Sequence, residues 1–167
     1  MVVPRIIEEK SIILAGMDFY GYPYETAGGW SEDNAIGQLW ERFTRFCSTH
    51  EGAIQHQVSE AGYELWLDVK QNEEDRSEYI FVGVEIDCVD DLPLELVVKV
   101  LPRTRYGVFA LKGAQITGDW PNAIEHKWLP EAGLHQSHDF IIERYDPVRF
   151  KGLEDPDSEL DIYVPII

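Results

Sequence analysis

Cysteine, an export signal and long apolar runs are scarce or missing in this sequence of 167 residues. The two cysteines, Cys47 and Cys88, form no CxxC pair and no disulfide framework. This favours free thiols in a reducing compartment over a bridge between them. The N-terminal stretch MVVPRIIEEK has acidic residues where a signal peptide needs an apolar stretch, and no apolar run approaches membrane-spanning length. The sequence therefore predicts a soluble, cytoplasmic protein.

Basic residues are also few: 14 Lys and Arg stand against 31 Asp and Glu, and the formal net charge is −17. A nucleic-acid surface needs a basic patch to neutralise phosphates, and an anionic membrane attracts basic segments. The charge therefore argues against direct binding to nucleic acid or to a membrane. Its long-range field would attract cations, although acidity alone ordinarily serves solubility.

The common catalytic and cofactor motifs are missing as well. The sequence contains no G-x-S-x-G, no P-loop and no GxGxxG. His135 and His138 are close in sequence, but no third and fourth ligand stands at a spacing typical of a metal site. We therefore expect no metal, no cofactor and no catalytic residue that a motif alone would reveal.

Strand-like segments dominate what is present. Hydrophobic residues make up 44% and aromatic residues 12% of the chain, which is typical of a globular protein, and residues 1–167 are expected to form a single domain. The segments rich in β-branched and aromatic residues are 5–10, 11–19, 63–70, 79–86, 94–101, 106–113, 139–146 and 160–167. The charged stretches 71–78 and 152–161 are interpreted as solvated loops.

Two segments have helical character. Residues 34–48 place apolar side chains at helical spacing, with Ser31 as the expected N-cap. Residues 119–128 predict a shorter helix, with Pro121 in its first turn and Pro130 just past its end.

These elements form an internal repeat. Residues 5–87 and 94–167 each give a strand pair, a helix, and two more strands with an acidic loop between them. The expected fold class is therefore α+β, with two pseudo-symmetric ββαββ halves that form a mainly antiparallel sheet with two helices and a central pocket. The repeat makes these residues equivalent: Trp40 and Trp128, Trp66 and Glu143, Phe81 and Tyr163.

A set of motifs in a fixed order resembles a known family. The motifs are LWERF (39–43), YIFVGVEI (79–86), P-x-x-x-Y-x-V-F-x-x-K-G (102–113), WLPEAG (128–133), ERY (143–145) and EL-DIYVPI (159–166). Together they resemble the GyrI-like small-molecule-binding domain, which is also the effector-binding domain of AraC- and MerR-type transcription regulators. The resemblance implies a central pocket that binds lipophilic cations, with Glu143 contacting the positive charge and Tyr163 as an aromatic pocket residue.

The strand around Glu143 can be interpreted in two ways. Alternation places Glu143 on the same face as Ile141 and Tyr145, opposite Phe140 and Ile142. If Phe140 and Ile142 pack under the helices, Glu143 points from the other face or into the cleft between the halves. From the residues alone, an exposed carboxylate is the ordinary interpretation, because unpaired carboxylates are rarely buried. The resemblance favours a pocket residue.

Several aromatic residues are candidates for the same pocket. Trp40 and Trp128 fit either the packing of a helix on the sheet or a pocket wall. The remaining predicted ligand-binding residues are Tyr145, Tyr163, Trp66 and Phe81. An aromatic cluster ahead of the first helix would serve as a lid or would hold its loop in place, and comprises Tyr20, Tyr22, Tyr24 and Trp30.

The sequence leaves three hypotheses about function. The first is a stand-alone binding protein or sensor for small lipophilic, cationic molecules, in which a transcriptional role would need a partner chain because the motifs begin within the first few residues. The second, by resemblance to GyrI-like hydrolases of reactive cyclopropane-containing compounds, uses Glu143 as general base and Tyr163 as hydrogen-bond donor. The third is an acidic inhibitor that binds a nucleic-acid enzyme.

Overall fold

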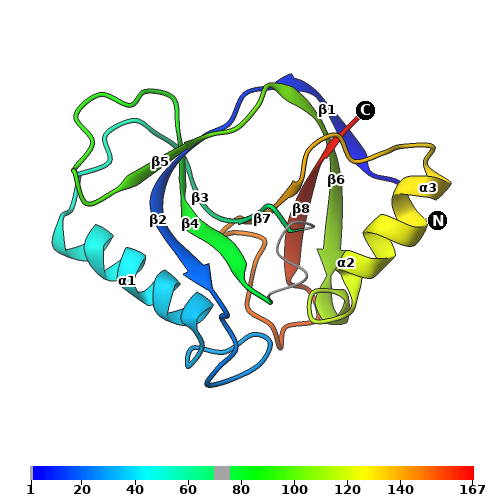
Figure 1. Ribbon diagram of the computed structural model, residues 1–167, viewed down its shortest axis with the longest axis horizontal. Helices are drawn as coiled ribbons and strands as arrows, with labels where there is room; N and C mark the ends of the chain where they lie inside the picture. The colour runs from blue at the N-terminus through cyan, green and yellow to red at the C-terminus, as the bar shows by residue number, and fades with distance from the viewer. Residues whose placement is uncertain (1, 70–75) are drawn as a thin grey trace.

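One antiparallel sheet organises the computed structural model, which describes residues 2–69 and 76–167. Its eight strands lie in the order β1-β6-β8-β7-β3-β4-β2-β5 and curl into a half-barrel (Figure 1). The strands are β1 (Arg5–Lys10), β2 (Ile13–Gly21), β3 (Gln57–Leu67), β4 (Glu78–Ile86), β5 (Val97–Val100), β6 (Thr104–Lys112), β7 (Phe140–Tyr145) and β8 (Glu159–Ile166). The predicted α+β class is confirmed, while most of the predicted loop 71–78 lies outside the described residues.

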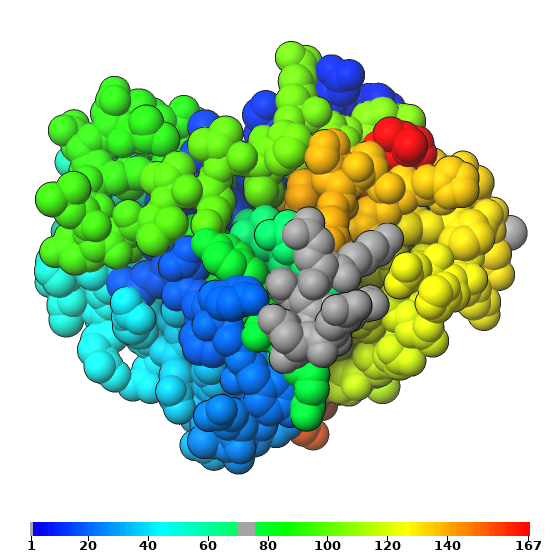
Figure 2. Space-filling view, viewed as in Figure 1, coloured from blue at the N-terminus to red at the C-terminus, as the bar shows by residue number. Residues whose placement is uncertain are grey.

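The strand order shows how the two halves are joined. If each strand of β1–β4 is replaced by its counterpart in β5–β8 and the reverse, the same strand order results, read from the opposite edge of the sheet. This is expected for two pseudo-symmetric halves. The predicted strand pairs are wrong, however, because β1 pairs with β6 and β5 pairs with β2. Each half therefore contributes an edge strand to the other. In Figure 2 the green residues around β5 lie at the upper left, beside the blue and cyan first half.

The first helix, α1 (Ala35–Thr49), begins at Asn34. The Asn34 Oδ1 atom accepts hydrogen bonds from the backbone N–H groups of Ile36 and Gly37, both at 3.1 Å, and so satisfies donors that a helix start leaves unpaired. Ser31 does not cap the helix, because its Oγ accepts from the backbone of Asp33. The predicted N-cap is thus corrected to Asn34.

The second helical segment runs further than predicted. It comprises α2 (Trp120–Ala123), a π-helical turn η2 (Ile124–Trp128) and α3 (Leu129–Glu131), preceded by the short η1 (Gly113–Gln115). Pro121 lies in the first turn as predicted. Pro130 lies inside the segment, where the π turn adapts the hydrogen-bond pattern ahead of it. No helix in the described ranges is both long enough and apolar enough to cross a membrane.

The two faces of the sheet bury different sets of residues. On one face α1 packs over β2 and β4, and the second helical segment packs over β6 and β8. The opposite face forms a core that includes Phe140 and Ile142. Phe140 and Ile142 therefore do not pack under the helices, and alternation turns Glu143 toward the helix-bearing face. There the central strands β3 and β7 lie between the two helical segments (Figure 1).

Candidate functional site

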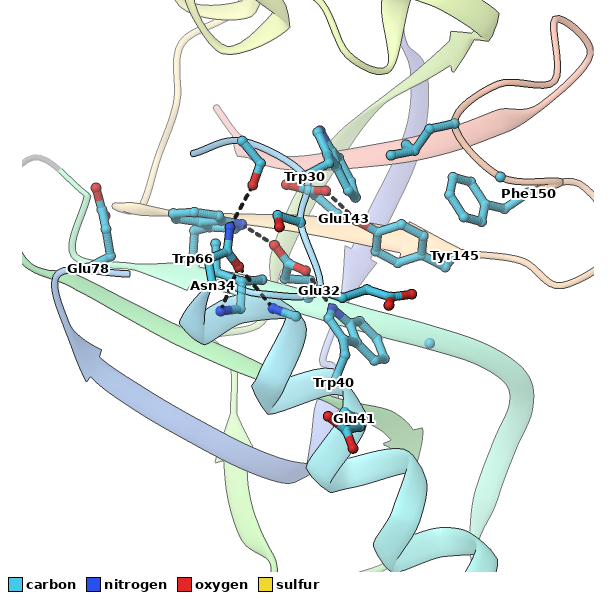
Figure 3. Close-up of a pocket in the computed structure, with 18 of the residues that line it drawn as sticks. Trp30, Glu32, Asn34, Trp40, Glu41, Trp66, Glu78, Glu143, Tyr145 and Phe150 are labelled. Atoms are coloured by element: carbon cyan, nitrogen blue, oxygen red, sulfur yellow. Dashed lines mark hydrogen bonds between the residues drawn. The ribbon is translucent and has the colours of Figure 1, made fainter. Parts of the chain in front are cut away.

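A cavity of about 1190 Å³ lies over the central strands on the helix-bearing face. Its walls come from the loop before α1, from α1 itself, from β3 and β7, and from the segments around Trp120 and Phe150. Aromatic rings form much of this wall: Tyr24, Trp30, Trp40, Trp66, Trp120, Tyr145 and Phe150. Figure 3 shows Trp40 extending from α1 toward the central strands, with Tyr145 beside it. The cavity is large enough for a drug-sized molecule.

Two glutamates stand together on the floor of the cavity. Glu64 on β3 and Glu143 on β7 are direct cross-strand partners in the antiparallel register, and each side chain belongs to a residue only 3% exposed. Directly opposed residues place their Cβ atoms about 4.5–5.5 Å apart on the same face. We refer to Glu64 and Glu143 as the glutamate pair.

Hydrogen bonds from aromatic side chains hold both carboxyl groups (Figure 3). The indole Nε1 atoms of Trp40 and Trp66 donate to Glu64 at 2.6 and 3.0 Å. The Tyr145 hydroxyl donates to Glu143 at 2.7 Å. These donors replace part of the hydration that the carboxylates lose on burial.

Burial makes ionisation of the glutamate pair costly. It raises the pKa of Glu64 to about 7, against the opposing effect of the two indole donors. Burial also raises the pKa of Glu143 well above its ordinary value, and the nearby charge of Glu64 raises it further. Two carboxylates in one apolar site disfavour each other's ionisation. Both effects favour the protonated form of the pair.

A compensating positive charge is missing from the described residues around the pair. Arg45 is the described wall residue with a permanent positive charge, and its guanidinium is paired with Glu41 one turn earlier on α1. No Lys, Arg or His in residues 2–69 and 76–167 forms an ion pair with Glu64 or Glu143. The same ranges contain no group of three residues suited to a metal ion.

The rings beside the pair pack against one another. Tyr145 makes edge-to-face contacts with Trp30, Trp40 and Phe150, with ring centroids 6.0, 5.6 and 4.9 Å apart. Gly62 makes room for this packing, because a Cβ at that position would lie 3.0 Å from the Trp40 ring. The aromatic wall is therefore supported by contacts that fix the orientation of Tyr145.

Four of the predicted site residues are brought together here: Glu143, Tyr145, Trp40 and Trp66. Three others lie elsewhere. Tyr163 and Phe81 point into the core on the opposite face, and Trp128 stacks on Phe109 beneath the second helical segment. The structure thus corrects the prediction that Tyr163, Phe81 and Trp128 line the pocket.

Glu64 lies in the site but is not among the residues predicted from the sequence. The repeat made Trp66 the equivalent of Glu143, whereas the residue opposite Glu143 in the sheet is Glu64. A signal was present: Glu64 interrupts an apolar strand in YELWL (63–67), just as Glu143 interrupts FIIERY. Trp120 and Phe150 were also missed, and no local pattern points to them. Of the loop aromatics, Tyr24 and Trp30 reach the cavity wall.

Comparisons with known proteins agree with this architecture. The family model described as Cass2, integron-associated effector binding protein, matches residues 5–166. The transcriptional regulator BrlR of Pseudomonas aeruginosa is 33% identical over 165 residues, which are 97% of this chain and 54% of BrlR. The chain thus spans about half the length of that curated relative.

Solved structures show the same fold. SAV2435 bound to tetraphenylphosphonium matches with a TM-score of 0.60 and 15% identity, covering 98% of this chain and 93% of that one. An integron cassette protein from Vibrio cholerae matches with a TM-score of 0.58 and 16% identity, covering 99% and 96%. The motif resemblance to the GyrI-like effector-binding domain is confirmed, and the chain belongs to the Cass2 family of integron-associated effector-binding proteins.

Proposed function

We propose that the protein binds small lipophilic cations in the cavity, with Glu143 pairing the positive charge among the aromatic rings. The observation that carries this proposal is the glutamate pair itself: two buried carboxyl groups, with no ion-pair partner in the described residues, on the floor of an aromatic cavity. A buried carboxylate is costly until a cation compensates it. A cationic ligand removes that cost, and a neutral ligand of the same shape does not.

The surrounding rings favour the same class of ligand. The faces of Trp and Tyr attract cations, with about 0.5–2 kcal/mol per favourable contact, and the apolar walls exclude water from the charge. SAV2435, which shares the fold, has been solved with tetraphenylphosphonium, a lipophilic cation. This supports the proposed ligand class.

A sensing role in transcription follows as part of the proposal. BrlR is a transcriptional regulator, and this chain matches about half of it. We propose that this domain supplies the ligand-sensing part, while contact with DNA is made by another segment or a partner chain. The net charge of −17 is unsuited to direct DNA contact.

The test is a calorimetric titration with tetraphenylphosphonium. Wild-type protein is expected to bind with micromolar affinity, and Glu143→Gln to bind at least tenfold more weakly, because the amide keeps the size of the side chain and removes its charge. Glu60→Gln, an exposed position on the same strand as Glu64, is the matched control and should bind like wild type. Equal binding by wild type and a folded Glu143→Gln protein would refute charge pairing.

A second candidate function is hydrolysis of reactive cyclopropane-containing compounds. The Tyr145 hydroxyl, 2.7 Å from Glu143, stands in the role first assigned to Tyr163, which faces the opposite core. A carboxyl group with a raised pKa is suited to general-base chemistry near neutral pH. Mass spectrometry after incubation with such an electrophile would reveal addition of water. Product formation no greater than with Glu143→Ala would exclude this activity.

A further inference from the structure

The wall of the cavity carries more negative charge than one positive centre can compensate. Five glutamates line it: Glu32, Glu41, Glu64, Glu78 and Glu143. Glu41 is already engaged by Arg45. Glu64 and Glu143 are the deepest of the five, since both are buried. A monocation that pairs with Glu143 would leave Glu64 either ionised without a partner or protonated.

Glu64 and Glu143 differ in their donors but share one of them. The two oxygens of Glu64 accept from Trp40 and Trp66, and Glu143 accepts from Tyr145 and interacts with the Trp66 indole N–H as well. Because the two residues are cross-strand neighbours and face the same cavity, their carboxyl groups offer two adjacent acceptors for positive charge. The flat ring of Trp66 and the edge-packed ring of Tyr145 stand beside these positions.

We propose that the preferred ligands of the cavity are dications, aromatic molecules with two positive centres, one paired with Glu143 and the other with Glu64. This inference rests on the proposed function and specifies its ligand class. A dication compensates both buried carboxylates at once. A monocation of the same shape compensates one and leaves the other protonated.

Proton release distinguishes the two kinds of ligand. The free pair favours a bound proton because burial raises the pKa of both groups, and the charge of Glu64 raises the pKa of Glu143 further. A dication requires both groups ionised, so it displaces one proton more than a monocation does, and its affinity rises more steeply with pH. The other titratable groups that line the cavity are Tyr24, Glu32, Glu41, Glu78, Tyr145 and Arg45. Because every wall carboxylate attracts a dication more strongly than a monocation, the share due to Glu64 is obtained by comparing the ratio of affinities in wild type and in Glu64→Gln.

A matched pair of probes tests the inference. The dication 1,1′-dimethyl-4,4′-bipyridinium and the monocation 1-methyl-4-phenylpyridinium share a biaryl shape and differ by one charge. Calorimetric titration of wild-type protein at pH 8 should give at least tenfold tighter binding of the dication. At pH 6 the ratio should fall severalfold, because the additional proton is harder to displace.

The variant Glu64→Gln tests which residue takes the second charge. It should lower the ratio at pH 8 severalfold, while the control Glu60→Gln keeps it at tenfold or more. Should Glu64→Gln fail to fold, the pH dependence of the ratio in wild type decides the question.

The outcomes separate the inference from the proposed function. A wild-type ratio near one at pH 8, with the monocation bound, would overturn the preference for dications and leave cation binding intact. A ratio that does not change between pH 6 and pH 8 would also overturn it. If neither probe nor tetraphenylphosphonium binds, the proposed function fails and the inference fails with it.

Discussion

Glu64 and Glu143 remain buried because aromatic N–H and O–H donors take the place of water around them. These hydrogen bonds satisfy the oxygens, but they do not neutralise the charge. The raised pKa of both groups is the measure of that deficit. Ionising these two carboxyl groups inside the protein is therefore more costly than ionising them in water.

This cost predicts how the stability of the unliganded protein depends on pH. The folded-state pKa of Glu64, about 7, lies above its ordinary value of 4.5, so the folded state binds this proton more tightly than the unfolded state. Stability is consequently lost as the pH rises from about 4.5 through 7. Glutamine does not titrate. The free energy of unfolding of Glu64→Gln, measured relative to wild type at the same pH, should therefore be higher at pH 8 than at pH 5. The expected difference between the two values is on the order of 3 kcal/mol.

Urea denaturation at the two pH values measures this difference, with Glu60→Gln as the exposed control. An effect of Glu64→Gln that is equal at pH 5 and pH 8 would mean that Glu64 titrates normally. The cost of ionising the pair would then be absent.

The element that shapes the mouth of the cavity is α1 with the loop before it. Asn34 ties the two together: its Oδ1 caps the helix and its Nδ2 donates to the carbonyl of Gly29 at 2.7 Å. Trp30, the next residue in that loop, contacts Tyr145 over the cavity. The helix start thus positions both a wall of the cavity and the ring above it.

Loss of the Asn34 side chain should destabilise the protein, whereas loss of the Ser31 hydroxyl should have little effect. Asn34→Ala is expected to reduce the free energy of unfolding by about 1–2 kcal/mol, the usual cost of a lost N-cap together with a buried side-chain hydrogen bond. Ser31→Ala removes a single contact in a turn and should cost less than about 0.5 kcal/mol. Urea denaturation of both variants provides the measurement, and a larger loss for Ser31→Ala would place the cap at Ser31.

At the scale of the whole molecule, local patterns predicted the elements but not all of their partners. Alternation along β7 correctly separated Glu143 from Phe140 and Ile142, which lie in the core of the opposite face. The same method failed for Phe81 and Tyr163: β4 and β8 are buried along nearly their whole length on both faces, so alternation does not indicate which face carries the cavity. The repeat identified equivalent strands, but it did not determine on which face of the sheet each side chain lies.

The pairing of β3 with β7 could not be predicted either, and it is what creates the site. This contact joins the two halves across residues distant in sequence, and no turn between the strands specifies its register. The exchange of β1 and β5 between halves is non-local in the same way. Glu64 became a site residue only through this register, which brings it opposite Glu143.

The central claim is that a lipophilic cation lies at the glutamate pair, where the halves meet. Tetraphenylarsonium, the arsenic analogue of tetraphenylphosphonium, allows the cation to be located directly by anomalous diffraction from crystals of the complex. An arsenic peak is expected over β3 and β7, between the carboxyl groups of Glu64 and Glu143 and the rings of Trp66 and Tyr145. A peak outside this cavity, or none in crystals grown at saturating ligand, would contradict it.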